Sequence, residues 1–363
     1  MIITCLRQEL KEAVSIVERF CGKNINLPII SNILLEARNG SLIIKATNLE
    51  IGVSTTIPTK IIKDGRIILP PRILSSILQT ISDEVVTIKE KQNIITIETE
   101  TTTSEINTNN PLDFPIIPTF TSKEYILIPN ADFKTALNRV IPTISASEFK
   151  PEIGGVYFWI DKKDLIIAGT DTFRLAEQRL KKFSSHPDNL RIIIPLRVMQ
   201  ETLKLLPEDG ETEIKFNAEQ VLITIKNTQL ITRFISGTYP DYRGLIPKEY
   251  GTTLRLERES FLVGVRLSGV FASKLNDVVL SYHSSQVLVE ISNPEVGKHI
   301  REVSGDVEGK PGRVGFNYRY LSDAVEAVAS KRVTIGIQDE TRPARVWSEE
   351  DPLFFTIVMP LRV

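Results

Sequence analysis

Cysteine and histidine are scarce in this chain, and their scarcity restricts its chemistry. Of 363 residues, two are cysteines and three are histidines. Cys5 and Cys21 fall in an expected first strand and at the end of an expected first helix, and a disulfide framework would need more cysteines. We therefore expect buried free thiols. His186, His283 and His299 are scattered, and no Cys or His pair has the spacing of metal ligands, so we expect no metal site and no cofactor.

Long apolar runs are also missing. Hydrophobic residues make up 42% of the chain and charged residues 25%, and no uncharged apolar stretch is long enough to suggest a membrane span. Residues 1–7 lack the basic stretch and apolar block of a secretory signal. We expect a cytoplasmic protein with no membrane partner. A chain of 363 residues is too long for one ordinary core, so two or three domains are expected.

Residues arranged for catalysis are missing as well. Residues 305–310 superficially resemble a phosphate-binding loop, but Pro311 stands where Ser or Thr would hold magnesium, and no apolar strand leads into the segment. We interpret it as a surface turn. Asp171 is the best candidate for a catalytic carboxylate, yet two similar segments have Asn48 and Asn293 at the matching place. A turn-forming role explains all three, so we expect no enzyme activity.

Charge of one sign is not in excess. Lys and Arg together number 44, and Asp and Glu together 45, so the net charge is −1. This balance excludes the uniformly basic surface that many nucleic-acid-binding proteins have. An acidic exterior with a basic inner face would give the same total, so the placement of the cations has to be considered.

What the chain does have is a threefold internal repeat, with a period on the order of 120 residues. Each copy contains a β-like run that ends in a hydroxyl residue and Asn or Asp, at residues 42–48, 165–171 and 287–293. An apolar strand and a helix follow in each copy, at residues 67–81, 192–206 and 314–328. Apolar residues in these helices recur at i, i+3, i+4 and i+7, the spacing of one buried helical face.

Each copy also opens with an expected helix, clear at residues 6–20 and 133–144 and less regular around Phe261. The copies close with an apolar or aromatic residue before proline, at Phe114-Pro115, Tyr239-Pro240 and Met359-Pro360. We predict an α+β chain of three repeated domains, each with two helices packed on antiparallel sheets. The predicted domains are residues 1–120, 121–247 and 248–363.

Three arginines occupy one position in the repeat. Arg72, Arg197 and Arg319 each stand at the start of a helix, where the helix dipole disfavours a cation. Other basic residues lie on or beside the expected helices: Arg7, Lys11, Lys23, Lys134, Arg139, Lys204, Lys331 and Arg332. Repeated cations on repeated helices would form a band that binds phosphates without reading sequence. Ordinary solvated helix faces are the alternative, and these residues alone do not decide between the two.

Five segments, in this order and inside the repeat, carry a resemblance to a known family. They are residues 27–32 (LPIISN), 170–176 (TDTFRLA), 239–243 (YPDYR), 315–320 (GFNYRY) and 358–363 (VMPLRV). Along its whole length the chain resembles the bacterial DNA sliding clamps, the beta subunits of the replicative DNA polymerase III. Each segment is a weak signal alone, and together they are specific.

The resemblance implies a processivity factor without a catalytic site, which encircles double-stranded DNA as a head-to-tail homodimeric ring. Sheets would lie outside and helices would line the hole, with phosphate contacts independent of sequence. The implied partners are the replicative polymerase, the clamp loader and other proteins with a clamp-binding motif. The implied DNA-facing cations are Lys23, Arg72, Lys134, Arg139, Arg197, Lys204 and Arg319. Asn24 stands where the family often has a basic residue.

The resemblance further implies a pocket between the second and third domains that takes a short apolar peptide. The matching residues are Ile153, Thr170, Thr172, Arg174, Leu175, Pro240, Leu245, Asn317, Tyr320, Pro343, Met359, Pro360, Leu361 and Arg362. Thr172-Phe173 replaces the Gly-His often found in the family, and Gly244 takes a place sometimes held by Arg. Candidate residues of the dimer seam are Ile106 on one chain and Val270 and Phe271 on the other, because an exposed strand edge needs a partner.

Two other functions stay open at the level of sequence. A peptide-binding scaffold with the same fold but without DNA function would also explain the near-neutral charge and Asn24. An enzyme that uses Asp171 is the third possibility, although the catalytic inventory is otherwise empty.

Overall fold

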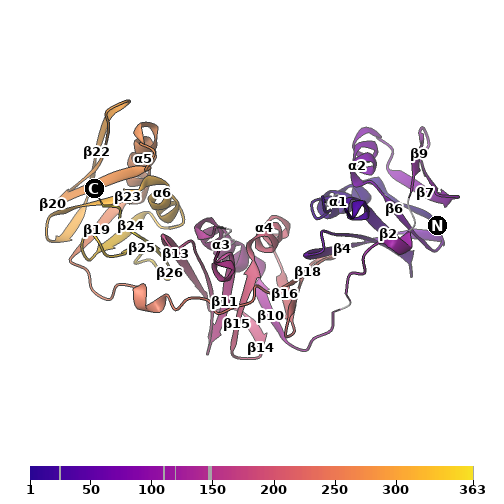
Figure 1. The fold of residues 1–363 in the computed structure, drawn as a ribbon, viewed down its shortest axis with the longest axis horizontal. Helices are drawn as coiled ribbons and strands as arrows, with labels where there is room; N and C mark the ends of the chain where they lie inside the picture. Colours follow the sequence, from indigo (N-terminus) through magenta and orange to yellow (C-terminus); the bar gives the residue numbers. More distant parts are fainter. Residues whose placement is uncertain (24–25, 109–110, 119, 146–148, 363) are drawn as a thin grey trace. The chain divides into compact units, whose positions relative to one another are not determined.

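A computed structural model of the protein describes residues 1–23, 26–108, 111–118, 120–145 and 149–362. These residues form six α-helices and antiparallel strands (Figure 1). The chain divides into two compact units: unit 1 contains residues 1–127 and 210–234, and unit 2 contains residues 128–209 and 235–363. Within the described part of the chain, no helix combines the length and the apolar character needed to cross a membrane.

The predicted repeat of strand and helix is confirmed. Three strands lead into the first helix of each copy: β1 (Ile2–Leu6) into α1 (Arg7–Glu18), β10 (Tyr125–Pro129) into α3 (Asn130–Val140), and β19 (Thr252–Glu257) into α5 (Arg258–Ser268). Three more lead into the second: β6 (Gly65–Leu69) into α2 (Pro71–Thr80), β15 (Leu190–Pro195) into α4 (Leu196–Leu205), and β23 (Gly312–Asn317) into α6 (Tyr318–Glu326). The helices pack in pairs, α1 with α2, α3 with α4 and α5 with α6.

The helices form because each has one apolar face. In α1 the buried residues Leu10, Ala13, Val14 and Val17 follow the i, i+3, i+4, i+7 spacing. The weak pattern around Phe261 nevertheless gives a regular helix, α5, whose first turn is capped by the Glu257 carboxylate. Gly264 interrupts the apolar pattern on the face of α5 that packs near Arg301 and Val289.

Unit 1 contains two sheets. One has the order β5-β1-β7-β8-β9, from β5 (Lys60–Lys63), β7 (Val85–Lys91), β8 (Ile94–Glu98) and β9 (Thr103–Asn107). In the other, strands follow the order β16-β17-β18-β4-β3-β2-β6, from β2 (Ile33–Arg38), β3 (Ser41–Thr47), β4 (Ile51–Pro58), β16 (Glu211–Phe216), β17 (Gln220–Ile225) and β18 (Thr228–Arg233). Residues 210–234 therefore group with the first repeat, because β18 pairs with β4, with Thr228 opposite Thr55.

Unit 2 has one twelve-stranded sheet in the order β15-β11-β12-β13-β26-β25-β24-β19-β22-β21-β20-β23. The strands not yet given are β11 (Gly155–Asp161), β12 (Asp164–Thr170), β13 (Arg174–Leu180), β20 (Asp277–His283), β21 (Gln286–Asn293), β22 (Gly297–Gly309), β24 (Arg332–Ile337), β25 (Ala344–Ser348) and β26 (Asp351–Val358). β13 pairs with β26, with Arg174 opposite Val358 and Gln178 opposite Phe354. One sheet thus runs from the second repeat into the third.

The two cysteines are free, as predicted. Cys5 is buried on β1, whereas Cys21 is only partly buried, so the expectation of full burial holds for Cys5 alone. Burial, with smaller contributions from the charges of Glu9 and Glu18, raises the pKa of each thiol to about 12. Both groups are therefore protonated at neutral pH and are poor nucleophiles.

Glu36 holds a buried ionic cluster on the sheet of unit 1. Its side chain is 5% exposed and lies 2.7 Å from Nζ of Lys45 and 2.8 Å from a guanidinium nitrogen of Arg66. Burial by itself raises the pKa of this carboxyl group, but the hydrogen bonds and charges of Lys45 and Arg66 outweigh it and lower the pKa from 4.5 to about 2. Arg66 lies directly opposite Glu36 on the neighbouring strand β6, so the strand register creates this cluster.

The Glu36 cluster makes stability depend on pH. Because the folded-state pKa is lower than the unfolded one, the stabilisation is complete above about pH 4.5 and is lost as the pH falls towards 2. Glu36→Gln should lower the free energy of unfolding at pH 7 by about 2 kcal/mol, a value reduced for the solvent exposure of Arg66. Urea denaturation of both proteins at pH 7 and pH 3 measures this difference, which should shrink at pH 3. An equal difference at both pH values would contradict the assignment.

Candidate functional site

The turn between β12 and β13 is built by its own side chains. The Thr170 hydroxyl donates to the Arg174 carbonyl oxygen (2.6 Å), and the Asp171 carboxylate accepts from the backbone N–H groups of Phe173 and Arg174, each at 3.0 Å. The first repeat builds the same turn, where Thr47 donates to the Ile51 carbonyl and Asn48 accepts from the Ile51 N–H (2.8 Å). Asn293 likewise accepts from the N–H of residue 295. The turn-forming role predicted for Asp171, Asn48 and Asn293 is confirmed.

Thr172 has a strained backbone in this turn. Its φ is 76°, in the left-handed region, and the matching residue of the first repeat, Leu49, has φ 77°. A β-branched residue is poorly suited to this conformation, whereas glycine adopts it without a steric penalty. Thr172 at this position therefore has a cost in stability.

Replacing Thr172 by glycine should stabilise the protein. Relief of the left-handed strain outweighs the added flexibility of glycine in the unfolded chain, so we expect Thr172→Gly to raise the free energy of unfolding by about 0.5–1 kcal/mol. Chemical denaturation midpoints measure the change. Thr135→Gly is the matched control, because Thr135 is exposed on α3 with ordinary helical backbone and its replacement should destabilise. Destabilisation by both changes would disprove the role of strain.

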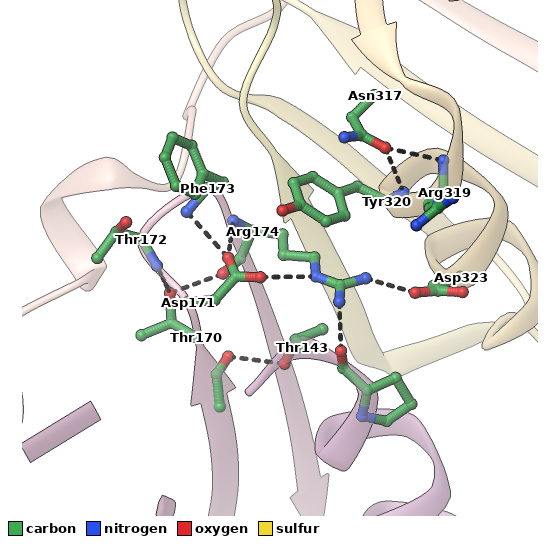
Figure 2. Close-up of polar contacts among 12 residues, drawn as sticks. Thr143, Thr170, Asp171, Thr172, Phe173, Arg174, Asn317, Arg319, Tyr320 and Asp323 are labelled. Carbon is green, nitrogen blue, oxygen red and sulfur yellow. Dashed lines mark hydrogen bonds and ion pairs between the residues drawn. The ribbon is translucent and has the colours of Figure 1, made fainter. Parts of the chain in front are cut away.

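Arg174 is held from several directions (Figure 2). Its Nε atom lies 3.0 Å from the Asp171 carboxylate, a second nitrogen pairs with Asp323 on α6, and a third donates to the Pro142 carbonyl. The guanidinium also lies over the Tyr320 ring, 4.3 Å from its centroid. All of these groups belong to unit 2. Arg174 therefore links the second repeat to the third, and each of its three guanidinium nitrogens already makes a contact within the chain.

The C-terminal segment after β26 joins the same place. The Met359 N–H donates to the Phe173 carbonyl (2.9 Å), and the Leu361 N–H donates to the Gly315 carbonyl on β23 (2.8 Å). Asn317 ends β23 and caps α6 by accepting from the N–H groups of Arg319 and Tyr320. Residues predicted for the peptide pocket from the turn, the α6 cap and the C-terminal segment are thus brought together in unit 2.

Burial separates the pocket residues into two groups. Ile153 and Leu175 are buried, and Leu175 packs in an apolar cluster with Tyr157, Tyr239 and Ile357. Leu245, in contrast, is 62% exposed. Thr172, Pro240 and Arg362 are also exposed. The remaining members are partly exposed: Thr170, Arg174, Asn317, Tyr320, Pro343, Met359, Pro360 and Leu361. The apolar surface available to a partner therefore includes Leu245 and not Leu175.

The neighbouring Phe173 was not among the predicted pocket residues. Its side chain is 58% exposed on the turn that carries Thr172. Gly244, on the other side of the predicted pocket, has open space where a side chain would begin. A large apolar side chain exposed beside a predicted apolar pocket is a candidate contact for a partner. The sequence shows that a phenylalanine is present, but only the structure shows that it is exposed.

The three repeated arginines hold equivalent places in the structure. Arg72, Arg197 and Arg319 are each the second residue of a helix, in α2, α4 and α6, and all three are exposed. The two that lie in unit 2, Arg197 and Arg319, begin helices at the ends of β15 and β23. The predicted repetition of this position is confirmed by the helix boundaries.

Lys23 and Arg72 line one hollow in unit 1. It has a volume of about 420 Å³ and is also lined by Glu18, Ser31 and Pro71. Pro70 and Pro71 leave α2 without a side-chain cap at its N-terminus, where anions are favoured. Two cations far apart in the sequence therefore meet at a helix end suited to phosphate. Asn24 lies outside the described residues.

Other predicted DNA-facing cations differ in their surroundings. Lys134 pairs with Glu208, and Lys204 lies 2.7 Å from the Glu201 carboxylate. Arg139 is a correction to the sequence prediction, because its side chain is only 9% exposed and lies 2.8 Å from the Asp351 carboxylate. It also stacks on the Phe354 ring of β26, 4.5 Å from the centroid. Arg139 fixes α3 to β26 and is not presented to a ligand.

Among the strand edges without a neighbouring strand in the described residues, two lie at the predicted seam residues. β9, which carries Ile106, is the last strand of its sheet. Residues 297–304 of β22 pair with β21 only, whereas residues 305–309 pair with β19. The interpretation of residues 305–310 as a surface turn is therefore wrong for residues 305–309, which form a paired strand. Near this second edge, Val270 is 69% exposed and the Phe271 ring stacks on His299 at 5.6 Å. Ile106 itself is buried by its own chain, so it is the backbone edge of β9 that is available.

Comparison with known proteins decides the family. Three family models match the chain: the N-terminal domain of the DNA polymerase III beta subunit at residues 1–118, its central domain at 127–241 and its C-terminal domain at 243–362. The chain belongs to the DNA polymerase III beta subunit family. These are the bacterial sliding clamps, and the fold predicted from the sequence, three clamp domains with antiparallel sheets, is confirmed.

Individual proteins similar to this chain are also sliding clamps. The beta sliding clamp of Staphylococcus epidermidis is 27% identical over 350 residues, which cover 93% of this clamp and 92% of that protein. The beta sliding clamp of Staphylococcus aureus is 26% identical over the same shares. Among solved structures, the sliding clamp of Bacillus subtilis has a TM-score of 0.95 at 22% identity, covering 100% of this chain and 99% of that one. The clamp of Bartonella birtlesii, bound to griselimycin, has a TM-score of 0.94 at 24% identity over 100% of both chains.

The family to which the chain belongs bears on whether it has a catalytic site. The family is the processivity subunit of DNA polymerase III, which is a clamp and not an enzyme. The reading of Asp171 as a catalytic carboxylate is therefore wrong, and the carboxylate is in fact paired with Arg174. The alternative of a scaffold without DNA function is not favoured either.

Proposed function

We propose that this clamp encircles duplex DNA as a head-to-tail homodimeric ring in the cytoplasm and tethers the replicative polymerase, the clamp loader and other motif-bearing proteins. Its domains are proposed as residues 1–120, 121–247 and 248–363. The observation that carries the proposal is the exposed arginine at the second position of α2, α4 and α6, in a chain of net charge −1. Cations repeated on the helices, without an overall basic charge, suit a polyanion bound on one face only.

The proposed DNA contacts are Arg72, Arg197 and Arg319, with Lys23 beside Arg72 and with Lys134 and Lys204 in a supporting role. The hollow shared by Lys23 and Arg72 supports a phosphate contact. Lys134 and Lys204 already have carboxylate partners, so their attraction for phosphate is weaker. Such contacts do not read bases, and a ring held by closure needs only weak ones in order to slide.

For the partner-peptide pocket, the proposed contacts are the exposed and partly exposed residues around Leu245, Tyr320 and Met359. Arg174 is proposed to set the shape of the pocket, because contacts with Asp171, Asp323 and Pro142 hold its guanidinium group in place. For the seam, the β9 edge of one chain would pair with residues 297–304 of β22 in a second copy, beside Val270 and Phe271. Pairing would cover both free edges, which otherwise favour aggregation.

The proposal is tested by comparing retention of the clamp on circular and on linear DNA. The clamp is loaded onto nicked circular DNA with its clamp loader, and the DNA is then linearised with a restriction enzyme. We expect the bound clamp to slide off the linear DNA and to be retained on the uncut circle. Blocking both ends of the linear DNA should restore retention. Equal retention on cut and uncut DNA without blocks would show that the clamp does not encircle DNA.

A further inference from the structure

A hollow lies on the third repeat beside the end of the proposed pocket. It has a volume of about 540 Å³, within the range of roughly 300–1,000 Å³ that is usual for ligand sites. Its apolar lining comes from Leu275, Val279, Ile291 and Leu361. Its charged lining comes from Asp277, Glu290, Lys298, Arg313 and Arg362. All of these residues belong to unit 2.

The charges of this hollow are not balanced internally. Lys298, Arg313 and Arg362 are all exposed, and within the described residues none of them has an ion-pair partner. Both acidic residues are already engaged as acceptors, Asp277 by the Ser273 hydroxyl (2.6 Å) and Glu290 by the Ser281 hydroxyl. These hydrogen bonds leave both carboxylates charged, so the lining has three cations against two carboxylates and a net positive charge around an apolar floor.

The hollow is continuous with the proposed peptide pocket. Leu361 and Arg362 belong to both, and the Leu361 N–H donates to Gly315 on β23. The same strand carries Arg313 in the hollow and ends at Asn317 in the pocket. A peptide that contacts Leu361 and Arg362 would therefore reach the free cations with a few more residues.

We propose that this hollow binds an acidic extension of the partner peptide, so that carboxylates next to the apolar core of the peptide increase its affinity. The inference rests on the proposed peptide pocket and adds a specificity determinant, Arg313, that lies outside it. Arg362 and Lys298 contribute from the two sides. Exposed ion pairs are individually weak, so two carboxylates should strengthen binding by roughly three- to tenfold at low salt.

Fluorescence anisotropy with labelled synthetic peptides tests the proposal. Each peptide contains the clamp-binding apolar segment of the cognate replicative polymerase, extended at one end or the other by Ser-Gly-Ser-Gly or by Asp-Gly-Asp-Gly. At one end, the acidic peptide should bind the clamp roughly three- to tenfold more tightly than the neutral one, and this gain should disappear at about 1 M salt. The end that responds identifies the direction in which the peptide lies.

Arg313→Gln should remove most of the acidic gain and leave the neutral peptide unchanged, and Arg313→Glu should make the acidic peptide the weaker binder. Lys310→Gln is the matched control, because Lys310 is exposed on the same repeat but does not line the hollow. Lys298 is left intact because it lies on the edge proposed for the seam. If the neutral peptides fail to bind, the proposed pocket is wrong. If they bind but acidic residues add nothing at either end, or Arg313→Gln changes neither, this inference is wrong.

Discussion

Reversing the charge of Arg72, Arg197 and Arg319 together should reduce retention of the loaded clamp on circular DNA by at least about a hundredfold at low salt. The three side chains are exposed at the same position of α2, α4 and α6, and a homodimer doubles each change. Attraction for phosphate at these positions then becomes repulsion. Polymerase processivity, measured as product length on primed circular DNA, should fall in parallel. Folding should not change, because none of the three side chains is buried.

The control variant makes the same change in charge at three positions outside the helices. Lys60, Lys163 and Lys310 are exposed, one in each repeat, and none lies on a helix. Their combined change to glutamate alters the net charge by the same amount, so the placement of charge is the only variable. Both triple variants should remain dimers by sedimentation. An equal loss of retention in both would assign the effect to net charge and would contradict a DNA-facing band of arginines.

Changing Leu245 to aspartate should weaken binding of the cognate polymerase peptide by at least about thirtyfold. Leu245 is 62% exposed in the free clamp, so a partner that covers it gains the burial of an apolar side chain. Aspartate loses that gain and places a charge in the contact. Fluorescence anisotropy measures the affinity, and the melting temperature should change little because no core contact is removed.

Leu49→Asp provides the comparison for Leu245→Asp. Leu49 is 57% exposed on the turn of the first repeat that corresponds to the Thr172 turn, and aspartate tolerates its left-handed backbone. This variant should bind the peptide as tightly as the unchanged clamp. Leu245→Asp should be loaded less efficiently, because the clamp loader is proposed to use the same pocket. The lifetime on circular DNA of the clamp that has been loaded should nevertheless be preserved in both leucine variants, which separates the peptide pocket from the DNA-facing surface. Unchanged peptide affinity in Leu245→Asp would remove Leu245 from the pocket.

Arg174 and Arg139 each connect the second repeat to the third. Asp323 is on α6 and Asp171 on the β12–β13 turn, so one guanidinium connects two repeats through two carboxylates. Arg139 makes a second connection, from α3 to Asp351 and Phe354 of β26. The resemblance placed both arginines at a binding surface, and both make ion pairs inside the chain. In this chain, both side chains therefore connect elements of the second repeat to elements of the third.

The sequence by itself determined the features that depend on spacing along the chain. These features are the apolar faces of the helices and the turn made by Asp171, each of which depends on residues within one or two elements. The threefold repeat of these local patterns then shows that Arg72, Arg197 and Arg319 are equivalent. The five short segments then placed the chain in its family. These signals survive without any knowledge of which strands pair.

Only the tertiary structure decided which charged groups are free. The pairing of β13 with β26 brings Asp351 close to Arg139. The pairing of β18 with β4 groups residues 210–234 with the first repeat and so divides the chain into its two units. The hollow that unites Lys23 with Arg72 and the unpaired cations around Leu361 arise in the same way. An ion pair is a matter of a few ångströms between side chains, and those distances are set by strand register and packing rather than by residue type.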